Sequence, residues 1–123
     1  MIGQAWCVVL DCRDAGELAG FYRRLVGGAV ERPDPRWAVG DACVVLRGGD
    51  GAVLVFQSVA DHRPPVWGAP EQQFHLDVRV DDLDAAEEAV VALGATPLDG
   101  GGADPAWRVY ADPAGHPFRL VRL

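Results

Sequence analysis

Hydrophobic and polar residues alternate with a period of two over residues 73–80, and the period then changes to that of a helix. The alternation predicts a strand with one apolar and one polar face. Its apolar positions are Phe74, Leu76, Val78 and Val80. From Asp81-Asp82 onward, apolar residues recur every three or four positions, at Leu83, Ala86, Val90 and Leu93. The segment therefore predicts a strand that leads directly into a helix, with Gly94 at the helix end.

The same strand and helix pattern occurs earlier in the chain. Residues 4–12 alternate in the same way, Asp14 is suited to cap a helix over residues 14–27, and Gly27-Gly28 ends it. Aligning Asp14 with Asp82 gives an offset of 68 residues, which also aligns Cys7 with His75. A unit repeated at about half the chain length indicates a duplication.

The remaining segments complete two β-α-β-β-β modules. Strands are predicted over residues 29–31, 37–46 and 52–59 in the first half, and over 96–98, 106–111 and 117–122 in the second. Glycine-rich turns separate the last strands, and a glycine-rich loop is predicted over residues 99–105. We interpret residues 1–123 as a single domain, with module one at about 1–60, a proline-rich linker at about 61–71 and module two at about 72–123.

The composition excludes some classes of partner. The chain has 18 acidic and 11 basic residues, a net charge of −7, which argues against nucleic acid because phosphate binding needs a basic face. Neither a signal peptide nor an 18-residue apolar stretch is evident, so no membrane partner is expected. Three cysteines without a CxxC motif fit a reducing cytoplasm, which is the expected location.

Several motifs resemble those of the vicinal oxygen chelate superfamily, which includes glyoxalase I, extradiol dioxygenases, fosfomycin-resistance proteins and bleomycin-binding proteins. They are LAGFYRRLVGG after Asp14, HLDVRVDDLDAA, LGA at residues 93–95 and the closing YADPAGHPFRLV. The resemblance is greatest to the glyoxalase-like domains of actinobacteria. It implies an α+β fold of two tandem βαβββ modules that form a cup-shaped, half-barrel sheet. It also implies a homodimer.

Metal-dependent members of the superfamily hold an ion with two ligands from each module, usually His or Glu. In this chain the resemblance places those positions at Cys7, near Val55, at His75 and at Arg119. A valine has no donor atom, and an arginine stays protonated and has no lone pair to give. Only His75 is a usual ligand, so no cofactor and no metal are predicted. The alternative is a divalent metal bound by His75 with a carboxylate.

The polar residues predicted to share the cup are candidates for ligand binding. They are Cys7, Gln57, Trp67, His75, Asp77 and Arg119. Each also has a structural interpretation: His75 as a hydrogen-bonded histidine, Asp77 with Arg119 as an internal ion pair, Cys7 as a small apolar filler and Gln57 as a structural or cup-lining residue. Trp67 is a candidate for the rim of the cup, with the core or a dimer contact as its alternatives. Trp6 is in phase with Val8 and Leu10 and is predicted to lie in the core.

The function predicted from these residues is the binding of a small organic molecule in the cup, with drug sequestration or resistance as one form of it. Sequestration needs shape, aromatic faces and a polar anchor rather than four metal ligands. The alternative is an enzyme of lyase, isomerase or dioxygenase type that uses His75 as metal ligand or general base, but the incomplete ligand set argues against glyoxalase I activity. The roles of Trp37 and Trp107 stay open between a cup rim, the core and a dimer contact.

Overall fold

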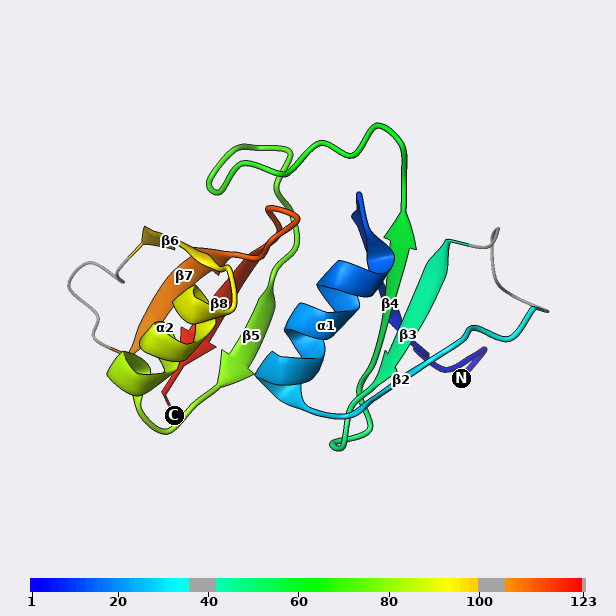
Figure 1. Ribbon diagram of the computed structural model, residues 1–123, viewed down its shortest axis with the longest axis horizontal. Coiled ribbons are helices and arrows are strands. Elements are labelled where there is room, and N and C mark those ends of the chain that lie inside the picture. Colours follow the sequence, from blue (N-terminus) through cyan, green and yellow to red (C-terminus); the bar gives the residue numbers. More distant parts are fainter. Residues whose placement is uncertain (36–41, 100–105, 123) are drawn as a thin grey trace. The chain divides into compact units, whose positions relative to one another are not determined.

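The computed structural model describes residues 1–35, 42–99 and 106–122. The chain divides into two compact units, Met1–His62 and Arg63–Leu123. Each unit contains one helix and one four-stranded sheet in the order β-α-β-β-β (Figure 1). The predicted α+β class and the two tandem modules are confirmed, and neither sheet closes into a barrel.

Unit one has the sheet order β1-β4-β3-β2. Its elements are β1 (Val8–Cys12), α1 (Ala15–Val26), β2 (Ala29–Glu31), β3 (Cys43–Arg47) and β4 (Val53–Ser58). β1 runs parallel to β4, and the other neighbours are antiparallel. The parallel pair needs a crossover connection, which α1 and the following hairpin provide.

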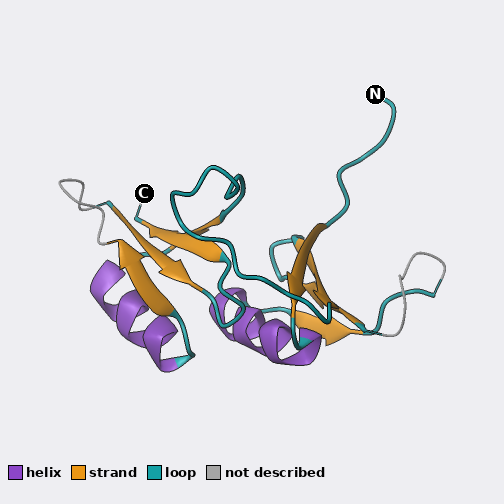
Figure 2. Ribbon diagram, turned by 90° about the horizontal axis from the view of Figure 1, so that it is seen from above, coloured by secondary structure: helices purple, strands orange, loops and turns teal. Residues whose placement is uncertain are grey.

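Unit two repeats this topology with the order β5-β8-β7-β6. Its elements are β5 (Leu76–Arg79), α2 (Leu83–Ala92), β6 (Thr96–Asp99), β7 (Trp107–Ala111) and β8 (Pro117–Val121). β5 is parallel to β8, as β1 is to β4. In both units the helix covers one face of its sheet (Figure 2); we call the opposite face the far face.

Matching caps begin the two helices. The Asp14 carboxylate accepts the Glu17 backbone N–H at 3.0 Å, and the Asp82 carboxylate accepts that of Ala85 at 3.1 Å. Each cap satisfies one of the backbone donors that a helix start leaves unpaired. Gly27 follows α1 with a φ of +76°, a conformation that suits glycine.

Aromatic pairs fill the space between helix and sheet. In unit one Tyr22 of α1 stacks on Phe56 of β4, with ring centroids 5.4 Å apart. In unit two Tyr110 stacks on Phe118 at 5.6 Å. All four side chains are buried. Since side chains alternate between faces along a strand, these contacts fix which residues of β4, β7 and β8 point away from the helices.

Two apolar residues that continue the alternating pattern are exposed rather than buried. Trp6 is 50% exposed and precedes β1, which begins at Val8 rather than at residue 4. Phe74 is 62% exposed, because β5 begins only at Leu76. The alternation thus continues beyond the paired residues, and the prediction that Trp6 belongs to the core is wrong. Trp37, the first part of the predicted strand 37–46 and most of the predicted loop 99–105 lie outside the described residues.

No helix within the described residues has the length and apolar character needed to cross a bilayer.

Candidate functional site

Five side chains of unit two form a continuous row on the far face of its sheet and beside it. We call it the polar row; its members are Trp67, His75, Asp77, Arg119 and Trp107. The sheet register places Asp77 of β5 directly opposite Arg119 of β8. Val109 of β7 lies opposite Arg119, and Trp107 is two residues before it, so both have the same parity. Arg108, between them, points to the other face and pairs with Asp84 and Glu87 of α2.

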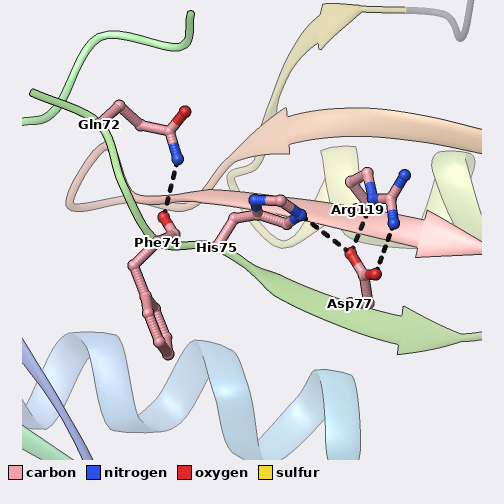
Figure 3. Close-up of polar contacts among 5 residues, drawn as sticks. All are labelled: Gln72, Phe74, His75, Asp77 and Arg119. Atoms are coloured by element: carbon pink, nitrogen blue, oxygen red, sulfur yellow. Dashed lines mark hydrogen bonds and ion pairs between the residues drawn. The ribbon is translucent and has the colours of Figure 1, made fainter. Parts of the chain in front are cut away.

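Asp77 lies at the centre of the row and contacts both Arg119 and His75 (Figure 3). Arg119 donates from Nε to Oδ1 at 2.7 Å and from Nη2 to Oδ2 at 2.6 Å. Nε2 of His75 lies 3.3 Å from the same Oδ1. Such two-point contact is the strong, directional form of an arginine–carboxylate pair. The second ring nitrogen of His75 points away from Asp77 (Figure 3).

An indole stands at each end of the row. The guanidinium carbon of Arg119 lies 5.3 Å from the ring centroid of Trp107, within cation–π range. The Trp67 ring meets the His75 imidazole edge-to-face at 5.4 Å. Both indoles are half-buried. The row therefore offers two aromatic surfaces with polar groups between them.

The charges in the row stabilise one another. The hydrogen bond from Arg119 is the main cause that lowers the pKa of Asp77 below its ordinary value; partial burial opposes this shift, and the charges of Arg119 and His75 add to it. Asp77 is therefore a carboxylate throughout the neutral range. Side-chain exposures of 46% for Asp77, 27% for Arg119 and 33% for His75 leave the group accessible.

The corresponding positions of unit one are not polar. By the offset of 68 residues, Val9 corresponds to Asp77, and its partner Val55 in the parallel pair corresponds to Arg119. Val55 belongs to a buried apolar cluster with Cys43, Val45 and Val53, and Cys7 packs against it. The two modules thus share a fold, but the ion pair across β5 and β8 has an apolar counterpart, Val9 and Val55, across β1 and β4.

The donor atoms do not fit the four-ligand metal site that the resemblance implies. Val55 is 1% exposed and has no donor atom, and Arg119 is a cation that already binds Asp77. Within residues 1–35, 42–99 and 106–122, no three His, Cys, Asp or Glu side chains come together as a group that could hold an ion. Catalytic zinc sites use three protein ligands, and Mg²⁺ or Ca²⁺ takes oxygen ligands.

The structure brings four of the six predicted site residues together. Trp67, His75, Asp77 and Arg119 are joined in the polar row. Cys7 and Gln57 lie in unit one: Cys7 packs against the apolar cluster, and Gln57 of β4 pairs with Asp11 and Cys43 in the sheet register.

Trp107 is the member of the row whose role the sequence leaves open between a cup rim, the core and a dimer contact. The sequence pattern does indicate which face Trp107 occupies: it shares parity with Val109, whereas Arg108 and Tyr110 have the opposite parity. Which β8 residue it approaches depends on the hairpin register, and the Trp107–Val121 pairing places it beside Arg119.

A separate pocket of about 580 Å³ lies in unit one. Trp6 and Val45 line it, together with the Glu31–Arg47 ion pair, in which Arg47 Nε donates at 2.8 Å. None of the predicted site residues belongs to its lining. Its charged walls neutralise one another, and it contains no member of the polar row.

Comparisons with known proteins agree on the fold. The fosfomycin resistance protein FosX of Listeria monocytogenes is similar over 100% of this chain and 95% of its own, with a TM-score of 0.72 and 12% identity. A glyoxalase/bleomycin resistance protein/dioxygenase family enzyme from Burkholderia phytofirmans has a TM-score of 0.69 and 18% identity, over 95% and 96% of the two chains. A glyoxalase-related enzyme from Fulvimarina pelagi has a TM-score of 0.67 and 20% identity, over 99% and 89%. These identities establish the fold alone.

No curated protein matches the chain in sequence. The family model of the glyoxalase-like domain, in contrast, matches residues 7–121, almost the whole chain. This span includes both modules and every member of the polar row. The chain therefore belongs to the glyoxalase-like domain family, within the vicinal oxygen chelate superfamily.

Proposed function

We propose that the protein binds a small aromatic molecule with an anionic or hydrogen-bond-accepting group on the polar row of module two. The observation that supports this most strongly is the order of the row, with Trp67 at one end, Trp107 at the other and the donors of His75 and Arg119 between them. Small-molecule sites combine apolar or aromatic surface with a few convergent polar groups in this way.

The fixed geometry of Arg119 supports binding of an acceptor. A guanidinium has five N–H donors, and Asp77 takes one from Nε and one from Nη2. Asp77 and Trp107 together hold the side chain in place, so less conformational entropy is lost when a ligand binds. The Asp77–Arg119 pair has no net charge, which favours a ligand with a single weak anionic group over a polyanion.

Sequestration of a drug-like molecule is the form of binding we favour. It needs no metal and no bond-making step, and the donor atoms at the four superfamily ligand positions are unsuited to a metal. One structural neighbour, at 12% identity, is a fosfomycin resistance protein. Association into a homodimer belongs to the same proposal; Trp6, Val9 and Phe74 are each at least 50% exposed and offer apolar surface for it.

A metal-free enzyme is the second candidate, and the contact between His75 and Asp77 favours it. A carboxylate that accepts from one ring nitrogen orients the imidazole and leaves the other nitrogen for proton transfer. A general base would give turnover with a pH dependence that His75→Gln abolishes. Sequestration would give binding without product.

Thermal shift and tryptophan quenching with a series of aromatic carboxylates, from benzoate to 1-naphthoate, test the proposal in the presence of EDTA. We expect saturable binding. Trp107→Phe and Arg119→Met should each weaken it at least about tenfold, which is a loss of about 1.4 kcal/mol or more of binding free energy. Trp6→Phe, in the other module, is the matched control and should bind normally. Equal loss in Trp6→Phe, or no saturable binding of any member of the series, would contradict the proposal.

A further inference from the structure

We propose that the guanidinium of Arg119 stands in the place of a metal ion and blocks a latent divalent-cation site at His75, Asp77 and position 119. The inference does not depend on the proposed function, because it concerns cation binding and is tested without any organic ligand. It follows from the way three side chains meet at one carboxylate.

Two nitrogen atoms converge on one oxygen of Asp77. Oδ1 of Asp77 receives both Arg119 Nε at 2.7 Å and His75 Nε2 at 3.3 Å. An imidazole nitrogen and a carboxylate oxygen this close are two of the three ligands that a catalytic zinc site uses. The third direction of approach belongs to position 119, which the sheet register fixes opposite Asp77.

Arg119 excludes an ion by its contacts with Asp77. Its Nε and Nη2 take one oxygen each of Asp77, so both carboxylate oxygens are already engaged by a cation. A divalent ion bound there would lie beside a permanent positive charge that cannot be removed by deprotonation. The Trp107 ring, 5.3 Å from the guanidinium carbon, helps to hold this charge over the site.

Module one carries different residues at the corresponding positions. The counterparts of Asp77 and Arg119 there are Val9 and Val55, and the counterpart of His75 is Cys7. None of these three supplies an oxygen or imidazole ligand. The two potential ligands, His75 and Asp77, and the cation that blocks them thus occur in module two. There a single residue, Arg119, decides between an ion pair and a metal site.

Replacing Arg119 by a ligand residue tests the inference, with Co²⁺ as the probe. Arg119→Glu and Arg119→His each complete a three-ligand set, and the second variant avoids placing two carboxylates together if the first is unstable. Circular dichroism establishes that each variant is folded. The visible spectrum of bound Co²⁺ separates nitrogen and oxygen ligands from the thiolates of Cys7, Cys12 and Cys43.

We expect both folded variants to bind one Co²⁺ at least about tenfold more tightly than the wild type, without thiolate charge-transfer bands. Arg119→Met, which removes the charge and adds no strong ligand, should gain less, and His75→Ala in the Arg119→Glu background should abolish the gain. Wild-type binding as tight as that of Arg119→Glu, or no gain in either folded variant, would overturn the inference.

Discussion

Arg119 and Asp77 face each other across the parallel strands β8 and β5 and are joined by two hydrogen bonds, of 2.7 and 2.6 Å. His75 approaches the same carboxylate at 3.3 Å, and Trp107 lies against the guanidinium. One carboxylate therefore organises an imidazole, a guanidinium and, through the guanidinium, an indole. In the first module the same cross-strand pair is Val9 and Val55, so two apolar side chains take the place of the ion pair.

The Asp77–Arg119 pair should stabilise the fold only above the acidic range. Its hydrogen bond lowers the folded-state pKa of Asp77 below the ordinary 3.8, so the contribution is complete above that value and is lost as the pH falls through the folded pKa. We expect Asp77→Asn to lower the free energy of unfolding at pH 7 by about 1 kcal/mol or less, because the pair is partly exposed.

Urea denaturation of the wild type and Asp77→Asn between pH 7 and pH 2 measures this difference. The gap between the two proteins should be constant down to about pH 4 and narrow below it. A gap that widens as the solution becomes more acidic would show that the pair does not act in this way.

Two adjacent glycines should respond differently to alanine. Both Gly27 and Gly28 have positive φ, but a Cβ at Gly27 meets nothing within 4 Å, whereas one at Gly28 would lie 2.3 Å from the carbonyl oxygen of Arg47. Gly27→Ala should cost about 1–2 kcal/mol of backbone strain, because φ +76° with ψ −169° is a conformation that essentially only glycine adopts. Gly28→Ala adds a clash with backbone that cannot rotate away, so we expect a loss of about 3 kcal/mol or expression as an unfolded chain. Equal melting temperatures for the two variants would refute this packing.

The capping aspartates should each contribute about 1 kcal/mol to the free energy of unfolding. Asp14→Ala and Asp82→Ala remove the acceptor for the backbone N–H of Glu17 and Ala85 respectively. Asp14→Ser and Asp82→Ser keep an acceptor and serve as matched controls that should recover most of the stability. If the serine variants were no more stable than the alanine variants, side-chain capping would not be the cause.

Two phenylalanines, one buried and one exposed, should differ in how much they contribute to the free energy of unfolding. Phe56 is fully buried and stacks on Tyr22, so Phe56→Ala should cost about 3–5 kcal/mol. Phe74 is 62% exposed, and Phe74→Ala should change the free energy of unfolding by about 0.5 kcal/mol or less. Chemical denaturation at low protein concentration measures both, and a large loss for Phe74→Ala would mean that this side chain is packed in the folded protein.

Most of the fold was predictable because its signals are local. Each module is marked by a change from period two to a helical period and by an aspartate that caps the helix. In the first module a glycine also follows the helix. The strand starts were not predictable in the same way. Phe74 and Trp6 continue an alternating pattern, but the pairing with β8 and β4 begins only at Leu76 and Val8.

The candidate site was predictable only in part, because it depends on register. Phase alone puts His75 and Asp77 on one face, and the closing motif aligned Arg119 with them. That Asp77 binds Arg119 through two hydrogen bonds, and that Trp107 covers the guanidinium, follows from the pairing of β5, β8 and β7. Cross-strand neighbours come from distant parts of the chain, and no local pattern specifies their pairing.

The polar row of module two is the ligand-binding site that we propose for this protein. The most direct measurement is a ¹H–¹⁵N spectrum of the tryptophan indole N–H groups during titration with 1-naphthoate, or with the tightest-binding carboxylate of the series, in the presence of EDTA. We expect the indole resonances of Trp67 and Trp107 to shift together and to saturate, while that of Trp6 stays in place. A saturating shift of Trp6 with Trp67 and Trp107 unchanged would contradict the account.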